Sequence, residues 1–127
     1  MQTPLKIDFH GPPDEVLRRV IIEQQSQLEQ IFDRLIAGHV TVKAPADHHR
    51  SGGLYEVHIH LSLPDGGEVN VGRSPPSDER QSDAIFAIHD AFRRARRQLQ
   101  EYTIRHVGRQ MEDHVRRLRA MPKMHEA

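Results

Sequence analysis

The stretch AIFAIHDAFRRARRQL, residues 84–99, decides the fold. Its apolar residues recur at spacings of three and four, which places them in one stripe along an α-helix. Arginines are interleaved with this stripe and lie largely off it. The helix therefore has an apolar side that must pack against a sheet and a cationic side that faces outward. The stripe consists of Ile85, Ile88, Phe92, Ala95 and Leu99, and Tyr102 extends it.

This helix is expected to begin between Ser77 and Ser82, because either serine can provide the N-cap. No proline follows until Pro122, so the helix should continue beyond the core. We therefore divide the chain into a βαβββα domain over residues 1–107 and a helical extension with a frayed end over residues 108–127. His89 is expected at the border of the apolar stripe, partly covered by the sheet.

Four segments upstream alternate between apolar and polar residues, which predicts four strands. Between the first two, helical spacing predicts a helix from about residue 14 to about residue 37, with Gly38 as its C′ glycine. The order β-α-β-β-β-α predicts an α+β two-layer sandwich: a four-stranded sheet with two helices on one face and an open, polar opposite face. The strands are expected over residues 5–10, 40–44, 55–63 and 68–71.

The composition excludes several classes of protein. The chain has no cysteine, which excludes disulfides and thiolate metal sites and fits a reducing cytosol. No apolar run approaches the roughly 18 residues of a membrane span, and the N-terminus lacks the basic and apolar regions of a signal peptide. We therefore expect a cytoplasmic protein without a membrane partner.

Charge is balanced overall but segregated along the chain. Residues 1–79 hold 7 Lys+Arg and 12 Asp+Glu, a net charge of −5, whereas residues 80–127 hold 11 and 6, a net charge of +5. A basic C-terminal half is compatible with a polyanionic partner. The alternative is a solvated helix face balanced by the acidic half. On charge alone the alternative is favoured, because nucleic-acid-binding domains typically have a pI above about 9.

From residue 5 to about residue 105 the sequence resembles the ribosome hibernation-promoting factors, also called ribosome-associated inhibitor A or sigma-54 modulation proteins. The resemblance rests on a strand of the type IDFHG, a long helix ending in FDRL, and the pattern of the second helix. It implies a fold with the layout of a double-stranded RNA-binding domain. It also implies binding to the small ribosomal subunit in the mRNA and tRNA channel, which blocks translation during stress. The matching positions in the second helix are Asp83, Ala87, Ile88, Ala91, Phe92, Arg94, Arg97, Gln98 and Leu99.

The resemblance implies that Arg94 and Arg97 contact 16S ribosomal RNA, with Arg93 and Arg96 as neighbours. Physical chemistry supports part of this, because two arginine pairs on consecutive turns spread guanidinium groups along about 6 Å. A guanidinium binds phosphate bidentately and stacks on bases. The predicted RNA-binding set is Arg93, Arg94, Arg96, Arg97, Lys43 and Arg73.

Two alternatives stay open. The arginines could pair with Asp90, Glu101 and the acidic first helix instead of with RNA. The chain could also be a protein-interaction module on the same fold, with lost or changed ribosome binding, that forms a homodimer through the C-terminal helix. That helix carries the apolar residues Met111, Val115 and Leu118 beyond the reach of the sheet, and exposed apolar stripes usually mark partners.

The ten histidines suggest other chemistry. His58 and His60 share one strand face and are weak candidates for zinc ligands, with Glu56 as a third ligand. No cysteine assists them, and no His-x-x-x-His pair lies with a glutamate on a helix, so we expect an open polar face without a metal. A general base also needs a partner and a pocket, which an open sheet does not provide. We therefore expect neither enzymatic activity nor a cofactor.

Overall fold

The computed structural model describes residues 2–45, 53–72 and 79–120, but not the side chains of residues 106–115, 117, 119 and 120. The observed order of elements matches the predicted β-α-β-β-β-α order, with two short 3-10 turns added. The elements are β1 (Lys6–His10), α1 (Glu15–Ile31), β2 (Ala37–Lys43), β3 (Glu56–Ser62), η1 (Pro64–Gly66), β4 (Glu68–Val71), η2 (Glu79–Ser82) and α2 (Ala84–Ala120).

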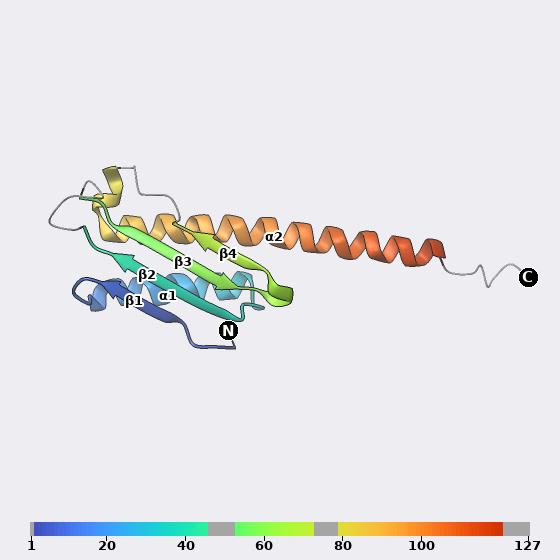
Figure 1. Cartoon of the computed structure of the whole chain (residues 1–127), viewed down its shortest axis with the longest axis horizontal. Coiled ribbons are helices and arrows are strands. Elements are labelled where there is room, and N and C mark those ends of the chain that lie inside the picture. The colour runs from blue at the N-terminus through green and yellow to red at the C-terminus, as the bar shows by residue number, and fades with distance from the viewer. Residues whose placement is uncertain (1, 46–52, 73–78, 121–127) are drawn as a thin grey trace, which may run out of the picture.

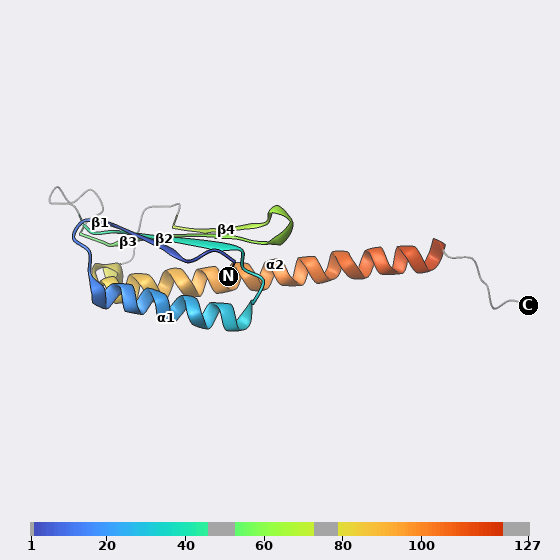
Figure 2. The same cartoon turned by 90° about the horizontal axis from the view of Figure 1, so that it is seen from below.

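The four strands form one mixed sheet in the order β1-β2-β3-β4. β1 and β2 run parallel, because α1 connects them as a crossover, whereas β2, β3 and β4 are antiparallel neighbours. Both helices lie on the same side of the sheet, and α2 runs on past its end (Figures 1 and 2). The predicted α+β sandwich with an extended C-terminal helix is confirmed.

The core lies between the sheet and the two helices. Alternate residues of the central strands, such as Val40, Val42 and Ile59, are buried against it, while the residues between them remain partly exposed. Each helix buries one of its sides against the sheet, and together these two sides form the opposite layer of the core. Its fully or almost fully buried members include Ile21 and Leu28 of α1 and Ala87, Ile88, Ala91, Phe92, Ala95 and Leu99 of α2.

The predicted end of the first helix is wrong. α1 ends at Ile31, and the extended residue Phe32 caps it by donating its N–H to the carbonyl of Leu28 at 2.9 Å. Leu35 is buried from the connection, and the Ile36 N–H donates to the Ser62 carbonyl at 2.9 Å, as a strand residue would. The spacing of these apolar residues fits a helix equally well, which explains the error. Gly38 consequently lies inside β2 and does not cap a helix.

The start of α2 also differs from the prediction. Asp83 is the N-cap, because its Oδ1 accepts hydrogen bonds from the N–H groups of Ile85 at 2.9 Å and Phe86 at 3.3 Å. Ser82 belongs to η2, and Ser77 lies outside the described residues. Ile85 was expected in the buried stripe but is 42% exposed. His89 was expected to be partly covered but is exposed, because the buried stripe is centred on the side of Ile88 and Ala95.

Candidate nucleic-acid interface

Polar contacts fix the orientation of α2 against the edge of the sheet. The Gln98 side chain hydrogen-bonds both backbone groups of Asn70 in the edge strand β4, donating from Nε2 to the carbonyl at 2.9 Å and accepting from the amide at 3.3 Å. One turn later the Tyr102 hydroxyl donates to the Pro64 carbonyl at 3.1 Å. These bonds define which residues of α2 point away from the core.

Tyr102 also packs closely on the β3–β4 turn. A Cβ atom at Gly67 would lie only 2.8 Å from Cε2 of Tyr102, so a side chain there would force the ring or the turn to shift. The Tyr102 ring meets Phe32 edge-on, with 6.2 Å between the ring centroids. The ring thus joins the turn, α2 and the segment after α1, and it prevents α2 from rotating about its own axis.

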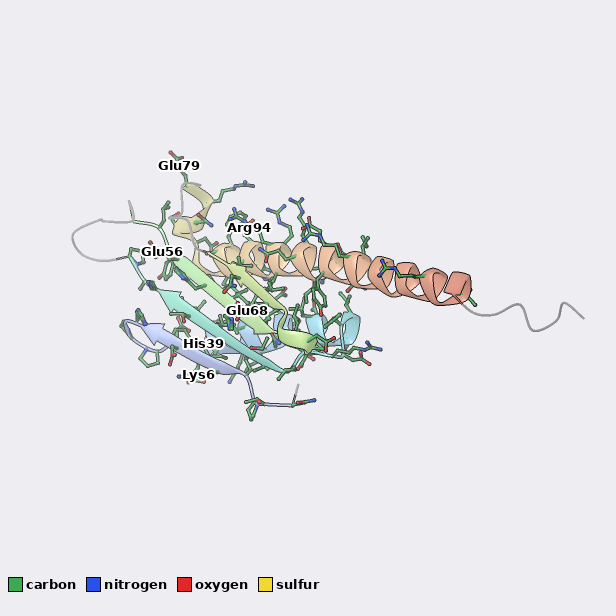
Figure 3. All side chains as sticks on the ribbon, turned by 45° about the vertical axis from the view of Figure 1, so that its right-hand side comes forward. Lys6, His39, Glu56, Glu68, Glu79 and Arg94 are labelled. Atoms are coloured by element: carbon green, nitrogen blue, oxygen red, sulfur yellow. The ribbon has the colours of Figure 1, made fainter. Side chains whose placement is uncertain are left out.

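This fixed orientation leaves Arg93, Arg94, Arg96 and Arg97 of α2 exposed. The side chains of Arg93 and Arg94 have exposed fractions of 74% and 56%. Figure 3 shows Arg94 extending from α2, apart from the labelled side chains of the strands. The helix therefore presents a row of guanidinium groups to solvent over little more than one turn, about 6 Å. We call Arg93, Arg94, Arg96 and Arg97 the arginine face.

A buried carboxylate organises half of the arginine face. Asp90 has an exposed fraction of only 7%. Its Oδ1 accepts from Nη2 of Arg93 at 2.5 Å, and its Oδ2 lies 3.1 Å from Nε of Arg94. The spacings of three and four residues place these side chains on adjacent turns of the same surface. Pairing with Asp90, one of the two alternatives drawn from the sequence, is therefore realised for these two arginines.

The pairing leaves the arginine face positively charged. Four guanidinium groups against the one carboxylate of Asp90 give a local charge of +3. In the part of the chain that the structure describes, no carboxylate lies within ion-pair distance of Arg96 or Arg97. An arginine also has five N–H donors, so Arg93 and Arg94 keep donors for a phosphate while Asp90 holds them.

The other two residues of the predicted RNA-binding set do not join the arginine face. Lys43 is the last residue of β2, and its neighbour Val42 points into the core. Strand alternation therefore directs Lys43 to the sheet face opposite the helices. Arg73 lies outside the described residues. Of the predicted set, the structure brings together only the four residues of the arginine face.

Sequence reasoning missed the two residues that organise this surface. Asp90 was considered only as a competitor for the arginines, although its spacing from Arg93 and Arg94 already indicated a shared partner. Gln98 was noted only as part of the family pattern. No sequence signal reveals that its amide bonds to the β4 backbone, because this contact depends on the edge of the sheet lying beside α2.

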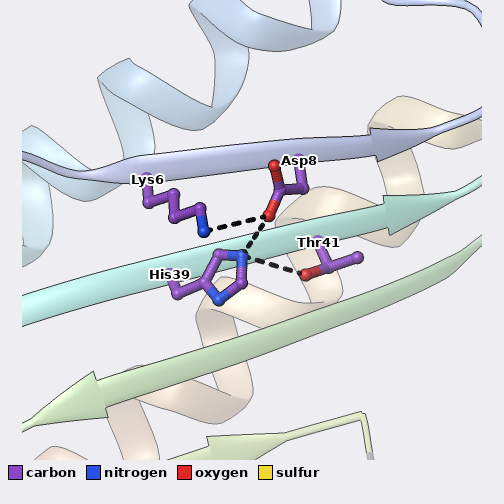
Figure 4. Close-up of polar contacts among 4 residues, drawn as sticks. All are labelled: Lys6, Asp8, His39 and Thr41. Atoms are coloured by element: carbon purple, nitrogen blue, oxygen red, sulfur yellow. Dashed lines mark hydrogen bonds and ion pairs between the residues drawn. The ribbon is translucent and has the colours of Figure 1, made fainter.

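The open face of the sheet carries alternating histidines and carboxylates. The shortest contact joins Nε2 of His39 to Oδ2 of Asp8 at 2.6 Å, with Nζ of Lys6 at 3.9 Å from the same oxygen (Figure 4). The hydrogen bond from His39 is the main cause that lowers the pKa of Asp8, and the charge of Lys6 adds to it. Thr41 lies 3.4 Å from the same histidine nitrogen.

The two candidate zinc ligands lie on this face, as predicted, but each faces a carboxylate of its own. Nε2 of His58 lies 3.6 Å from Glu56, and Nε2 of His60 lies 3.5 Å from Glu68. Among the described residues, no three histidine or carboxylate side chains converge as a metal site would require. The arrangement favours ion pairs over metal binding.

An apolar groove runs between the end of α1 and α2. It has a volume of about 380 Å³ and includes Arg96 at its border. Ile31 and Ile104 line it with exposed fractions of 54% and 73%. Further along α2, Leu118 is 55% exposed. Ile31 and Ile104 form an apolar surface beside the arginine face, and Leu118 lies farther along the helix.

Comparisons with known proteins agree with this architecture. The family model described as "Sigma 54 modulation protein / S30EA ribosomal protein" matches residues 6–107. No curated protein is similar enough to count as a match. In the described parts of the chain, no helix has the length and apolar character needed to cross a bilayer.

Two solved structures show the same fold. A ribosomal subunit interface protein from Coxiella burnetii has a TM-score of 0.62 at 15% sequence identity, over 79% of this chain and 97% of that one. The N-terminal domain of Protein Y from Thermus thermophilus has a TM-score of 0.57 at 20% identity, over 80% of this chain and 99% of that one.

Proposed function

Because the chain belongs to the sigma 54 modulation protein / S30EA ribosomal protein family, we propose that it is a ribosome-associated translation inhibitor. It binds 16S ribosomal RNA of the small subunit in the cytoplasm and acts by occupying the site, as a hibernation factor does. One structural neighbour is a ribosomal subunit interface protein, which supports this assignment. The proposal requires no catalysed reaction and no cofactor.

The observation that carries the proposal is the exposed arginine face with its local charge of +3. Structured RNA is recognised largely through its shape and its phosphates, so no base-reading motif is required. Asp90 reduces the conformational freedom of Arg93 and Arg94 before binding, which lowers the entropy lost when they meet phosphates. Arg96 and Arg97 supply further donors beside them.

Cosedimentation with purified small subunits over a salt series tests the proposal. Each phosphate contact contributes about 0.7 to 0.9 to the slope of log K against log salt. The variant Arg96→Gln/Arg97→Gln should therefore bind more weakly and reduce this slope by about 1.4 to 1.8. The double variant Arg19→Gln/Arg34→Gln removes the same charge from exposed positions in and after α1 and serves as the matched control.

The control separates a local contact from a general effect of charge. We expect it to retain most of the wild-type slope, because Arg19 and Arg34 do not belong to the arginine face. Equal losses in the two double variants would contradict the assignment to α2. Absence of cosedimentation at low salt would contradict ribosome binding itself.

A second candidate function rests on the apolar surface beside the arginine face. The exposed side chains of Ile31, Ile104 and Leu118 favour a homodimer in which α2 of one copy packs along the groove of the other. Sedimentation equilibrium of the full chain tests this, with Ile104→Asp as the disrupting variant. A monomeric mass for the unaltered chain would remove this candidate and leave RNA binding unaffected.

A further inference from the structure

The open face of the sheet has a charge that depends on histidine protonation. No described helix or strand packs against this face, since both helices lie on the other side (Figure 2). Its charged and titratable groups come from all four strands and alternate with the buried residues. They are Lys6, Asp8 and His10 on β1, His39 and Lys43 on β2, Glu56, His58 and His60 on β3, and Glu68 on β4.

The protonation state of the four histidines decides the sign of the net charge on this face. With neutral histidines, two lysines against three carboxylates give −1; with four protonated histidines the sum is +3. Histidine is the residue type whose charge ordinarily changes between about pH 5 and pH 8. The whole face is thus anionic when the histidines are neutral and cationic when they are protonated.

Each carboxylate of the face has a histidine beside it. Asp8 meets His39 at 2.6 Å, Glu56 meets His58 at 3.6 Å, and Glu68 meets His60 at 3.5 Å. When these histidines are protonated, each pair becomes neutral, so the carboxylates cease to repel an approaching anion. His10 and the two lysines then supply the excess positive charge.

Three of the histidines are also close neighbours on the central strands. His39 and His60 are direct partners in the β2–β3 register, and His58 faces Thr41 two residues away on β3. Neighbouring strands lie about 4.8 Å apart, and alternate residues of a strand about 6.6 Å apart. Single-stranded RNA binds through bases stacked on aromatic side chains, including histidine, together with a cationic surface along the backbone.

We propose that the open sheet face is a second RNA-binding surface, which takes single-stranded RNA when its histidines are protonated. This surface does not depend on the arginine face, which lies on the other side of the molecule. A duplex is a poorer fit, because its bases are stacked on each other and unavailable to the imidazole rings. The two faces would let one molecule hold structured RNA and a single strand at once.

Fluorescence anisotropy with a short labelled oligouridine, at about pH 5.5 and about pH 7.5 on either side of the usual histidine pKa, tests this proposal. We expect binding at the lower pH to be about tenfold tighter or more. The slope of log K against log salt should steepen by up to about 2.8, for four added charges at about 0.7 each.

Variants locate the effect. His39→Gln/His58→Gln/His60→Gln should lose most of the acid-induced gain, with an unchanged circular dichroism spectrum as the folding control. His89→Gln alters an exposed histidine of α2 and should retain the gain. Loss of the gain in His89→Gln, or its survival in the triple variant, would overturn the proposal. An equal gain for a blunt RNA duplex would overturn the single-strand assignment.

Two further measurements keep this test separate from ribosome binding. Amide chemical shifts of the unaltered protein should respond to oligouridine at low pH in β2 and β3; a response confined to α2 would refute the sheet site. The variant Arg93→Gln/Arg94→Gln/Arg96→Gln/Arg97→Gln should lose small-subunit binding and keep the acid-induced gain. If small-subunit binding fails in the unaltered protein while the gain persists, only the proposed function is refuted.

Discussion

Replacing Asp90 by asparagine should destabilise the fold and uncouple the arginine face. The carboxylate is 7% exposed and accepts from Arg93 at 2.5 Å and from Arg94 at 3.1 Å. A hydrogen bond to a charged group contributes about 1.5–3 kcal/mol, whereas an exposed helical ion pair contributes about 0.3–0.5 kcal/mol. Asp90 is buried, but the guanidinium groups of its partners are more than half exposed. We therefore expect each Asp90–arginine pair to stabilise the fold by about 1 kcal/mol, between these two limits.

Urea denaturation followed by circular dichroism measures this loss, because the chain has no tryptophan. A destabilisation of about 2 kcal/mol, at an m-value of about 2 kcal/mol/M, lowers the midpoint by about 1 M urea. The double variant Arg93→Gln/Arg94→Gln should destabilise the protein by at least as much, because it leaves a buried carboxylate without these two partners.

A double-mutant cycle isolates the interaction. In the Asp90→Asn background, Arg93→Gln/Arg94→Gln should change the free energy of unfolding by only a few tenths of a kcal/mol, because the carboxylate is gone. Additive effects, with a coupling energy below about 0.3 kcal/mol, would show that Asp90 does not hold these arginines. Asp90 would then not preorganise the arginine face, although the arginines would remain exposed.

Three other perturbations test the contacts around this face. Gly67→Ala should destabilise the protein by about 1–3 kcal/mol in urea denaturation, because the added methyl group overlaps Tyr102; a neutral effect would contradict the close packing. Gln98→Ala should lower the free energy of unfolding by about 1–2 kcal/mol and accelerate hydrogen exchange of the Asn70 amide, which donates to Gln98. An unchanged exchange rate would show that water replaces the Gln98 side chain freely. His39→Gln should raise the pKa of Asp8, measured by carboxyl NMR titration, because it removes the main cause of the lowering. The lowered pKa of Asp8 stabilises the folded protein at pH values above the unfolded pKa near 3.8. This stabilisation should fade as the pH falls through the folded pKa of Asp8. An unchanged Asp8 titration in His39→Gln would refute the role of His39 as the main cause.

The sequence predicted the order of elements and the faces of the strands, because alternation with a period of two leaves little choice of which side is buried. The end of α1 was mispredicted because Leu35 and Ile36 continue a helical spacing, while the Ile36 amide pairs with Ser62 of β3 instead. Local pattern cannot distinguish these cases, since only the position of β3 decides where the Ile36 amide finds its acceptor. The exposure of Ile85 has the same origin, because the angle at which α2 crosses the sheet is set by contacts distant in sequence.

The candidate site was predicted in part for a similar reason. The arginines on the outer side of α2 follow from helical spacing alone, whereas the placement of Lys43 required the sheet. Once β2 is in position, Lys43 lies between His10 and Glu56 in the strand register, on the face opposite the arginines. The predicted RNA-binding set, which was chosen by charge, therefore divides between two surfaces of the molecule.

This division also changes what the zero net charge of the chain means. A balanced total argues against nucleic-acid binding only if charges of both signs mix on each surface. Here a charge of +3 gathers on α2, where arginine remains protonated at any physiological pH, while the opposite face varies with its histidines. Binding to a polyanion depends on charges within about 8–10 Å at ordinary salt. The charge of one face, and not the net charge of the chain, therefore decides whether that face binds a polyanion.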